Sequence, residues 1–130
     1  MKTELLYLAS VAAFTGLMWV PYVLDRIVAW GLPDAVGYPI HPKAQSAWAE
    51  RLKKAHANAV ENLVVFAALV GVAVAAGVSN PVVAGASVAF FWARVVHALA
   101  YTFAVPWART LAFTVGFAAQ AAVAWQVLVR

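Results

Sequence analysis

The sequence predicts an all-α integral membrane protein built as a four-helix bundle. Of its 130 residues, 65% are hydrophobic and 11% are charged, whereas a soluble domain is about 45–50% apolar and about 25% charged. Residues 5–24 and 110–129 carry no charge, and neither does the longer stretch 62–93. Each is long enough to cross a hydrocarbon core, which takes about 20 apolar residues. A soluble monomer of this length could not bury so much apolar surface, so that class is excluded.

The first span is expected at about residues 4–30, because its apolar run continues to Asp25 and Arg26, where a helix would reach the interface. The apolar run is too long for a signal-peptide core, and no small-residue cleavage site closes it, so we expect the segment to be retained. The chain contains no cysteine. Any sulfur chemistry must therefore use a thiol from outside the protein.

The uncharged stretch 62–93 is too long for one span and is divided by Gly77-Val78-Ser79-Asn80-Pro81. Glycine suits the position after a helix, asparagine suits an N-cap and proline suits the first helical residue. The sequence therefore predicts helices at about 45–77 and 81–104. Pro106 separates the third from a fourth at about 107–129, and the four spans form a single domain, 1–130.

The basic residues predict the orientation of the bundle. One end collects seven of them: Arg26, Lys43, Arg51, Lys53, Lys54, Arg94 and Arg109. Lys2 and Arg130 fall at the other end. Because cytoplasmic loops carry the excess of Lys and Arg, we expect loops 31–44 and 104–107 in the cytoplasm and both termini outside. In a bacterium this would be the inner membrane. Topology alone explains the basic excess, so no nucleic-acid partner is expected.

Polar side chains share faces on the two central helices. At 100° per residue, one face of the second helix carries Arg51, Lys54, Asn58, Glu61 and Asn62. One side of the third helix carries Arg94, His97 and Tyr101. Arg109 lies in the first turn of the fourth helix, and Arg26 lies at the cytoplasmic end of the first.

This arrangement predicts a site for an anionic ligand. A charge at membrane depth costs about 2.5–3.5 kcal/mol on insertion scales, so it marks a function or a buried partner. Here five cations (Arg26, Arg51, Lys54, Arg94 and Arg109) accompany Glu61 alone. The histidines share no face with carboxylates, and no metal site is expected.

Two segments carry a resemblance to a known family. The first is Arg51-Leu-Lys-Lys54-Ala-His56-Ala-Asn58-Ala-Val-Glu61-Asn62, followed by Phe66. The second is Arg94-Val-Val-His97-Ala-Leu-Ala-Tyr101, followed by Pro106 and Arg109. In these segments and in its four-span layout the chain resembles the MAPEG family, the membrane-associated proteins in eicosanoid and glutathione metabolism, and in particular its bacterial-type members.

The resemblance implies a homotrimer that binds glutathione as co-substrate between subunits, near the cytoplasmic face. It places Asn58, Glu61, His97, Tyr101 and Arg109 against glutathione, with Lys54 and Arg94 in the same ligand-binding set. It brings Arg26 in from a neighbouring protomer and gives Arg109 the catalytic role of stabilising the thiolate. Ala57, Lys54 and Phe113 depart from the residues of eicosanoid-making members, which weighs against prostaglandin or leukotriene synthesis.

The leading functional hypothesis is therefore a glutathione-dependent membrane transferase or peroxidase that acts on lipophilic electrophiles. An alternative is a non-catalytic lipid-binding or accessory subunit on the same scaffold. A small multidrug-type transporter ranks third, because it needs an acidic residue in the first span and we expect none there.

Overall fold

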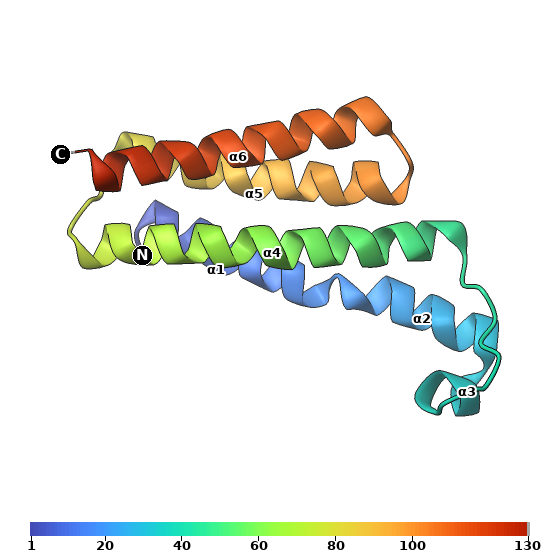
Figure 1. Ribbon diagram of the computed structural model, residues 1–130. Helices are drawn as coiled ribbons and strands as arrows, with labels where there is room; N and C mark the ends of the chain where they lie inside the picture. Colours follow the sequence, from blue (N-terminus) through green and yellow to red (C-terminus); the bar gives the residue numbers. More distant parts are fainter. Residues whose placement is uncertain (130) are drawn as a thin grey trace.

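The computed structural model describes residues 1–129, which form helices and no strand (Figure 1). The helices are α1 (Thr3–Leu17), α2 (Trp19–Trp30), α3 (Leu32–Val36), α4 (Ala47–Ala75), α5 (Pro81–Thr102) and α6 (Pro106–Leu128). Four segments are long and apolar enough to cross a membrane: Thr3–Trp30, α4, α5 and α6. The predicted fold class is confirmed. The trimer stays a prediction, and Arg130 lies outside the described residues.

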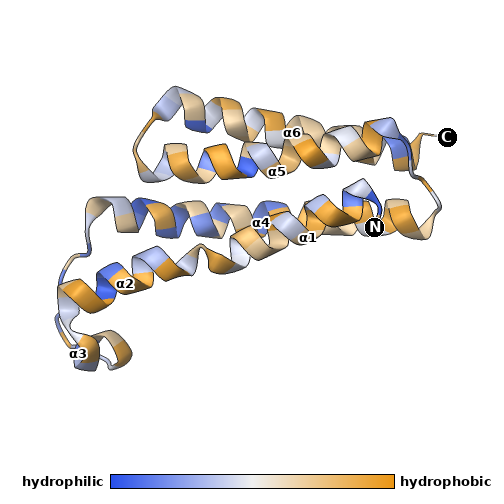
Figure 2. Cartoon of the chain, turned by 180° about the vertical axis from the view of Figure 1, so that it is seen from behind, coloured by the Kyte–Doolittle hydropathy of each residue, from blue (hydrophilic) through white to orange (hydrophobic). Residues whose placement is uncertain are grey.

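The spans alternate in direction along the bundle. Both termini and the α4–α5 turn lie at one end, and α3 and the α5–α6 turn lie at the other (Figure 1). The two loops that we expect in the cytoplasm therefore share one end. Exposed apolar side chains are spread over the helices, with hydrophilic positions concentrated on the half of α4 nearest the α3 loop (Figure 2).

The turn between α4 and α5 is built as its sequence predicts. Gly77 has a φ of +73°, which favours glycine, and follows the last turn of α4. The Asn80 side chain caps α5 by accepting a hydrogen bond from the Val83 amide at 3.0 Å. Pro81 begins the helix, where its missing N–H leaves no bond unmade.

The first span differs from the single helix that we expected, because it is interrupted at Met18. Pro21 has no N–H and cannot bond the Leu17 carbonyl four residues earlier. The Met18 amide instead bonds Thr15 in a tighter turn, at 3.3 Å. The two parts of the span pack against different helices, since α1 packs against α4 and α5 whereas α2 packs against α3 and α4.

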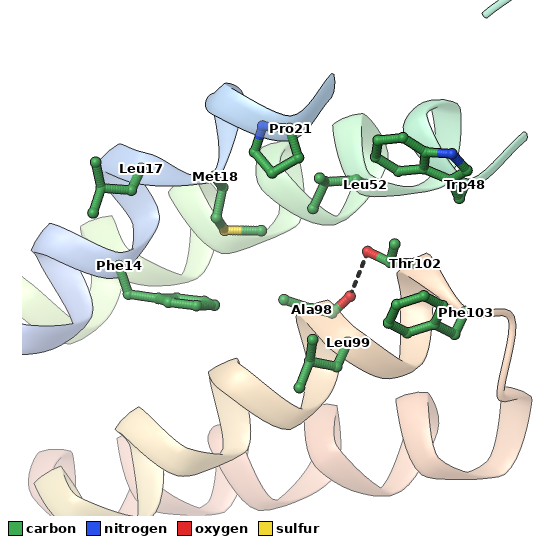
Figure 3. A pocket seen from close by; sticks show the side chains of 10 residues that line it. All are labelled: Phe14, Leu17, Met18, Pro21, Trp48, Leu52, Ala98, Leu99, Thr102 and Phe103. Atoms are coloured by element: carbon green, nitrogen blue, oxygen red, sulfur yellow. Dashed lines mark hydrogen bonds between the residues drawn. The ribbon is translucent and has the colours of Figure 1, made fainter. Parts of the chain in front are cut away.

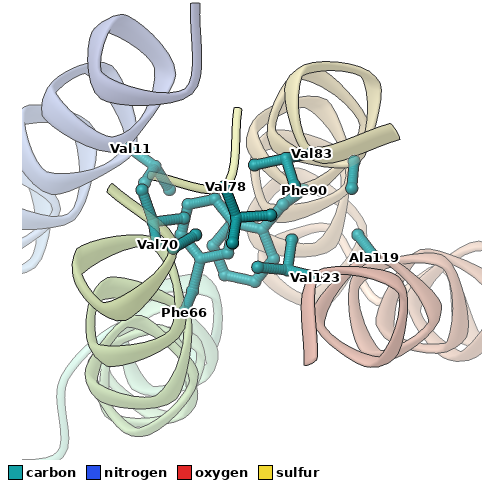
Figure 4. Packing of buried hydrophobic residues seen from close by; sticks show 10 residues of the cluster. Val11, Phe66, Val70, Val78, Val83, Phe90, Ala119 and Val123 are labelled. Carbon is teal, nitrogen blue, oxygen red and sulfur yellow. The ribbon is translucent and has the colours of Figure 1, made fainter. Parts of the chain in front are cut away.

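The main core lies between α1, α4, α5 and α6 in the half of the bundle nearest the termini (Figure 4). Its centre is a stack of the Phe66 and Phe90 rings with centroids 3.9 Å apart. A second cluster nearer the α3 loop is built from Met18, Leu52 and three alanines, Ala55, Ala59 and Ala98. Small side chains leave this second region less completely filled.

The long connection 31–46 is tied to α2. Asp25 accepts hydrogen bonds from the Ser46 amide at 3.0 Å and from the Ser46 hydroxyl. The Trp30 indole N–H donates to the Lys43 carbonyl at 2.7 Å. These bonds fix the start of α4, two residues later than the sequence predicted.

The expectation of a first span without acidic residues is wrong. Glu4 lies in the first turn of α1, is buried, and accepts a hydrogen bond from the Ser79 hydroxyl at 2.8 Å. The contact joins α1 to the α4–α5 turn, beside the bond from Asn80 Nδ2 to Gln126 Oε1 at 2.8 Å. Glu4 therefore has a packing partner at the terminal end of the bundle.

Replacing Asn80 with alanine should lower the free energy of unfolding by about 1 kcal/mol more than replacing Gln126 with alanine. Asn80→Ala removes both the α5 cap and the bond to α6, whereas Gln126→Ala removes only the latter. Reversible unfolding in mixed detergent micelles measures the difference. Equal losses in the two variants would contradict the capping role.

Candidate functional site

Arg94 is the centre of the polar residues within the bundle. It lies on α5 and only 3% of its surface is exposed. Its Nη2 donates to Asn58 Oδ1 of α4 at 2.7 Å and to His97 Nδ1 at 3.3 Å. Gly116 of α6 packs beside its aliphatic stem. Three helices thus enclose one guanidinium group.

The guanidinium of Arg94 is incompletely satisfied. Among residues 1–129, its Nε and Nη1 have no hydrogen-bond partner. A guanidinium keeps its charge in proteins and carries five N–H donors. Burying a guanidinium without a counter-charge is expensive, and the described residues supply no acceptor for these two nitrogens.

A continuous row of contacts leads from Arg94 to the end of the bundle. The His97 and Tyr101 rings meet edge to face with centroids 5.7 Å apart. The Arg109 guanidinium lies over the Tyr101 ring, 4.7 Å from its centroid, in cation–π geometry. We call these five residues the polar stripe: Asn58, Arg94, His97, Tyr101 and Arg109.

Two amides extend the polar stripe toward the middle of the bundle. Asn62 Nδ2 donates to the Asn58 carbonyl at 2.9 Å, and Gln120 Nε2 of α6 donates to the Asn62 carbonyl at 3.1 Å. The first bond lies within α4, whereas the second joins α6 to α4. An interhelical bond of this kind contributes about 0.6 kcal/mol in membranes, and it helps to hold α4 and α6 in register around Arg94.

Arg109 also lines a small cavity of about 190 Å³ with Tyr101 and Arg51. Arg51 Nε donates to the Thr102 carbonyl at 2.8 Å, across the end of α5. The sequence placed Arg51 among the five cations from which we predicted an anionic-ligand site. Its bond to a helix C-terminus could not be found by periodicity, because it depends on where α5 ends.

Lys54 and Glu61 lie on the exposed side of α4, one turn to either side of Asn58. The cavity lined by Arg109 includes neither Glu61 nor Arg94. A single chain therefore leaves the α4 side of the polar stripe open, with its one acidic candidate facing outward.

Arg26 lies apart from the polar stripe. Its guanidinium is stacked over Trp30 of the same helix, 4.4 Å from the ring, and α2 packs against α3 and α4. His56 of α4 also lies apart from the polar stripe. It faces α2, where its Nδ1 is hydrogen-bonded to the Tyr22 hydroxyl at 2.9 Å.

Sequence reasoning named Phe113 only as a departure from eicosanoid-making members, without placing it beside His97, and it did not single out Gly116. Phe113 of α6 lies near His97, with ring centroids 6.3 Å apart. Gly116 allows α6 to approach the stem of Arg94. Both lie on the face of α6 that meets α5, and a helical wheel carrying Ala112, Gly116 and Ala119 as the small-residue face would have indicated it.

Residues 1–129 contain no group of three His, Cys, Asp or Glu placed to hold a metal ion.

Comparison with known proteins gives one match. The family model described as MAPEG family matches residues 6–129, nearly the whole chain. No curated protein and no solved structure matches.

Replacing Asn58 with leucine should lower the free energy of unfolding by about 1.5–3 kcal/mol, because it removes a hydrogen bond to a charged group. The same substitution in an Arg94→Leu background should have a much smaller effect, since the guanidinium is no longer there to be satisfied. A double-mutant cycle by reversible unfolding in detergent gives the coupling. Equal losses in both backgrounds would show that Asn58 does not act through Arg94.

Proposed function

The chain belongs to the MAPEG family, and from this premise we propose that it is a glutathione-dependent membrane transferase or peroxidase acting on lipophilic electrophiles. The observation that carries the proposal is the polar stripe, a row of contacts from buried Arg94 to exposed Arg109. Buried, incompletely satisfied cations suit an anionic ligand.

The charges of glutathione match the residues around the polar stripe. The tripeptide carries two carboxylates, one ammonium group and one thiol. Arg94 offers two unpartnered nitrogens, Nε and Nη1, to a carboxylate, and exposed Lys54 offers a second cation on the adjacent face of α4. Glu61 is the acidic residue available for the ammonium group. Arg109 then remains for the thiol, at the end of the row.

Arg109 would act by stabilising the thiolate. A free thiol has a pKa of about 8.5 and is only a few per cent thiolate at pH 7. Lowering that pKa by two units takes about 2.7 kcal/mol. One cation at about 4 Å supplies about 4 kcal/mol at an effective dielectric constant of 20. A single arginine is therefore sufficient.

The chemical step then needs no group on the protein to change its charge. In the transferase reaction the thiolate sulfur forms a bond to the electrophilic carbon, and the leaving group departs with its electron pair. The thiol proton passes to water. In the peroxidase reaction the thiolate attacks a peroxide oxygen, the O–O bond breaks, and the alkoxide leaves and takes up a proton as the alcohol. The glutathione sulfenic acid then reacts with the thiolate of a second glutathione, which forms the disulfide and releases hydroxide that takes up a proton as water.

A homotrimer in the bilayer would complete the site. Lys54, Asn58 and Glu61 lie on a side of α4 that one chain leaves uncovered, and Arg26 lies apart from the polar stripe of its own chain. A neighbouring protomer can bring its Arg26 to that side. Loops 31–44 and 104–107 then face the cytoplasm, where glutathione is available.

Arg109→Leu should lower the rate of glutathione conjugation at pH 7 roughly twentyfold, because the thiolate fraction falls when the thiol pKa returns to about 8.5. The activity of the variant should recover as the pH rises toward 9, since the thiol then ionises without help. The rate of conjugation of a chlorodinitrobenzene, measured across pH with purified protein, gives this profile.

Lys53→Leu is the matched control, because Lys53 bonds Gln45 and takes no part in the polar stripe. It should keep the wild-type profile. Equal activity of Arg109→Leu and wild type at pH 7 would exclude the thiolate role. Glutathione binding without any conjugation by the wild type would favour a non-catalytic accessory subunit.

Co-expression of Arg26→Gln and Arg109→Leu chains should restore activity that each variant lacks alone. In a mixed trimer, some sites combine Arg109 of the first chain with Arg26 of the second. Conjugation by doubly tagged, co-purified assemblies tests this. Inactive mixed assemblies would contradict a site shared between protomers.

A further inference from the structure

A second, apolar pocket of about 500 Å³ lies beside the break in the first span (Figure 3). Phe14, Met18 and Pro21 line one side, and Leu52, Ala98 and Phe103 belong to the α4 and α5 sides. Its volume falls in the range of about 300–1,000 Å³ that is typical of ligand sites. No residue of the polar stripe lines this pocket.

The pocket follows from the sequence of the first span. Pro21 interrupts the helix at Met18, and beyond that point α2 packs against α3 and α4 rather than α5. The last turn of α5 is thereby left without a helix on this side. Ala98, opposite Met18 and Leu52, is too small to fill the gap (Figure 3).

The pocket does not suit water. The Thr102 hydroxyl at its edge is already donated to the Ala98 carbonyl at 2.7 Å. A buried water needs two to four polar partners, whereas an empty apolar space forfeits the contacts of its lining. A hydrocarbon ligand satisfies this environment.

The pocket opens on the outer surface of the single chain. Phe103 at its edge is 68% exposed and Leu99 is 54% exposed, whereas Leu52 at its back is only 8% exposed. The opening is at the basic end of the bundle, where exposed Lys53 follows the lining residue Leu52 and its ammonium lies 5.9 Å from the ring centroid of Tyr22, next to the lining residue Pro21. A chain that entered from the bilayer would keep its headgroup near Lys53.

The pocket is also separate from the proposed site of chemistry. Arg51 bonds the Thr102 carbonyl at 2.8 Å, and Arg51 and Arg109 line the other cavity, on the far side of that bond. We propose that an acyl chain of an anionic bilayer phospholipid occupies the pocket at the Met18 break. It would fill the space between α2 and α5.

Photolabelling tests the proposal. The full chain is placed in nanodiscs of phosphatidylcholine with a small share of phosphatidylglycerol that carries a diazirine on its acyl chain. After irradiation, mass spectrometry measures labelling of peptides that contain Leu52, which a lipid reaches only from within the pocket. Labelling of Trp92, which is 55% exposed on α5 outside the pocket, measures ordinary lipid contact.

Ala98→Phe should abolish labelling at Leu52 and leave labelling at Trp92 unchanged, because its ring fills the pocket. Val82→Phe, on an exposed position of the same helix at the other end, should behave like wild type. Met18→Ala enlarges the pocket and should increase labelling at Leu52. It keeps the test decisive if Ala98→Phe fails to fold.

Leu52 labelling that is absent in the wild type, or unchanged in Ala98→Phe, would overturn the proposal. Equal labelling of Leu52 by phosphatidylcholine that carries the diazirine would overturn the part of the proposal that requires an anionic headgroup. A higher KM for a lipophilic electrophile in Ala98→Phe would assign the pocket to the co-substrate instead. Labelling is measured without glutathione, so its result does not depend on catalysis.

Discussion

The structure depends on how one buried guanidinium is satisfied. Arg94 lies between three membrane-spanning helices and is bonded to the side chains of Asn58 and His97, neither of which is a carboxylate. Glu4, the buried acidic side chain, is bonded to Ser79 at the opposite end of the bundle. Removing one partner from a buried ion pair costs about 3–5 kcal/mol. An anion from outside the chain that bonds the free nitrogens of Arg94 would offset the cost of burying this charge.

The helices around Arg94 hold both of the features that we associate with function. The Phe66–Phe90 stack fixes α4 against α5, and Gly116 lets α6 approach closely enough to place Arg109 over Tyr101. On the other side of α5, the break at Met18 releases α2 and leaves an apolar pocket. One helix thus separates a polar surface from a hydrocarbon one.

Much of this arrangement was predictable from helical periodicity. The spacing of Arg94, His97 and Tyr101 placed them on one side of α5, and Gly77, Asn80 and Pro81 marked a turn that the structure confirms. The break at Met18 was not predicted, because a proline is tolerated within an apolar membrane run when neighbouring helices compensate. The bond from Arg51 to Thr102 and the outward position of Glu61 depend on distances between helices. A single sequence does not give those distances.

The most direct test compares the binding of glutathione with that of its dimethyl ester, which lacks both carboxylates, by isothermal titration calorimetry. If Arg94 receives a carboxylate, wild-type protein should prefer the acid by about tenfold or more, because a charged hydrogen bond contributes about 1.5–3 kcal/mol. Arg94→Gln should lose most of that preference. An unchanged preference in Arg94→Gln would show that the buried guanidinium has another purpose, and would contradict the account at its centre.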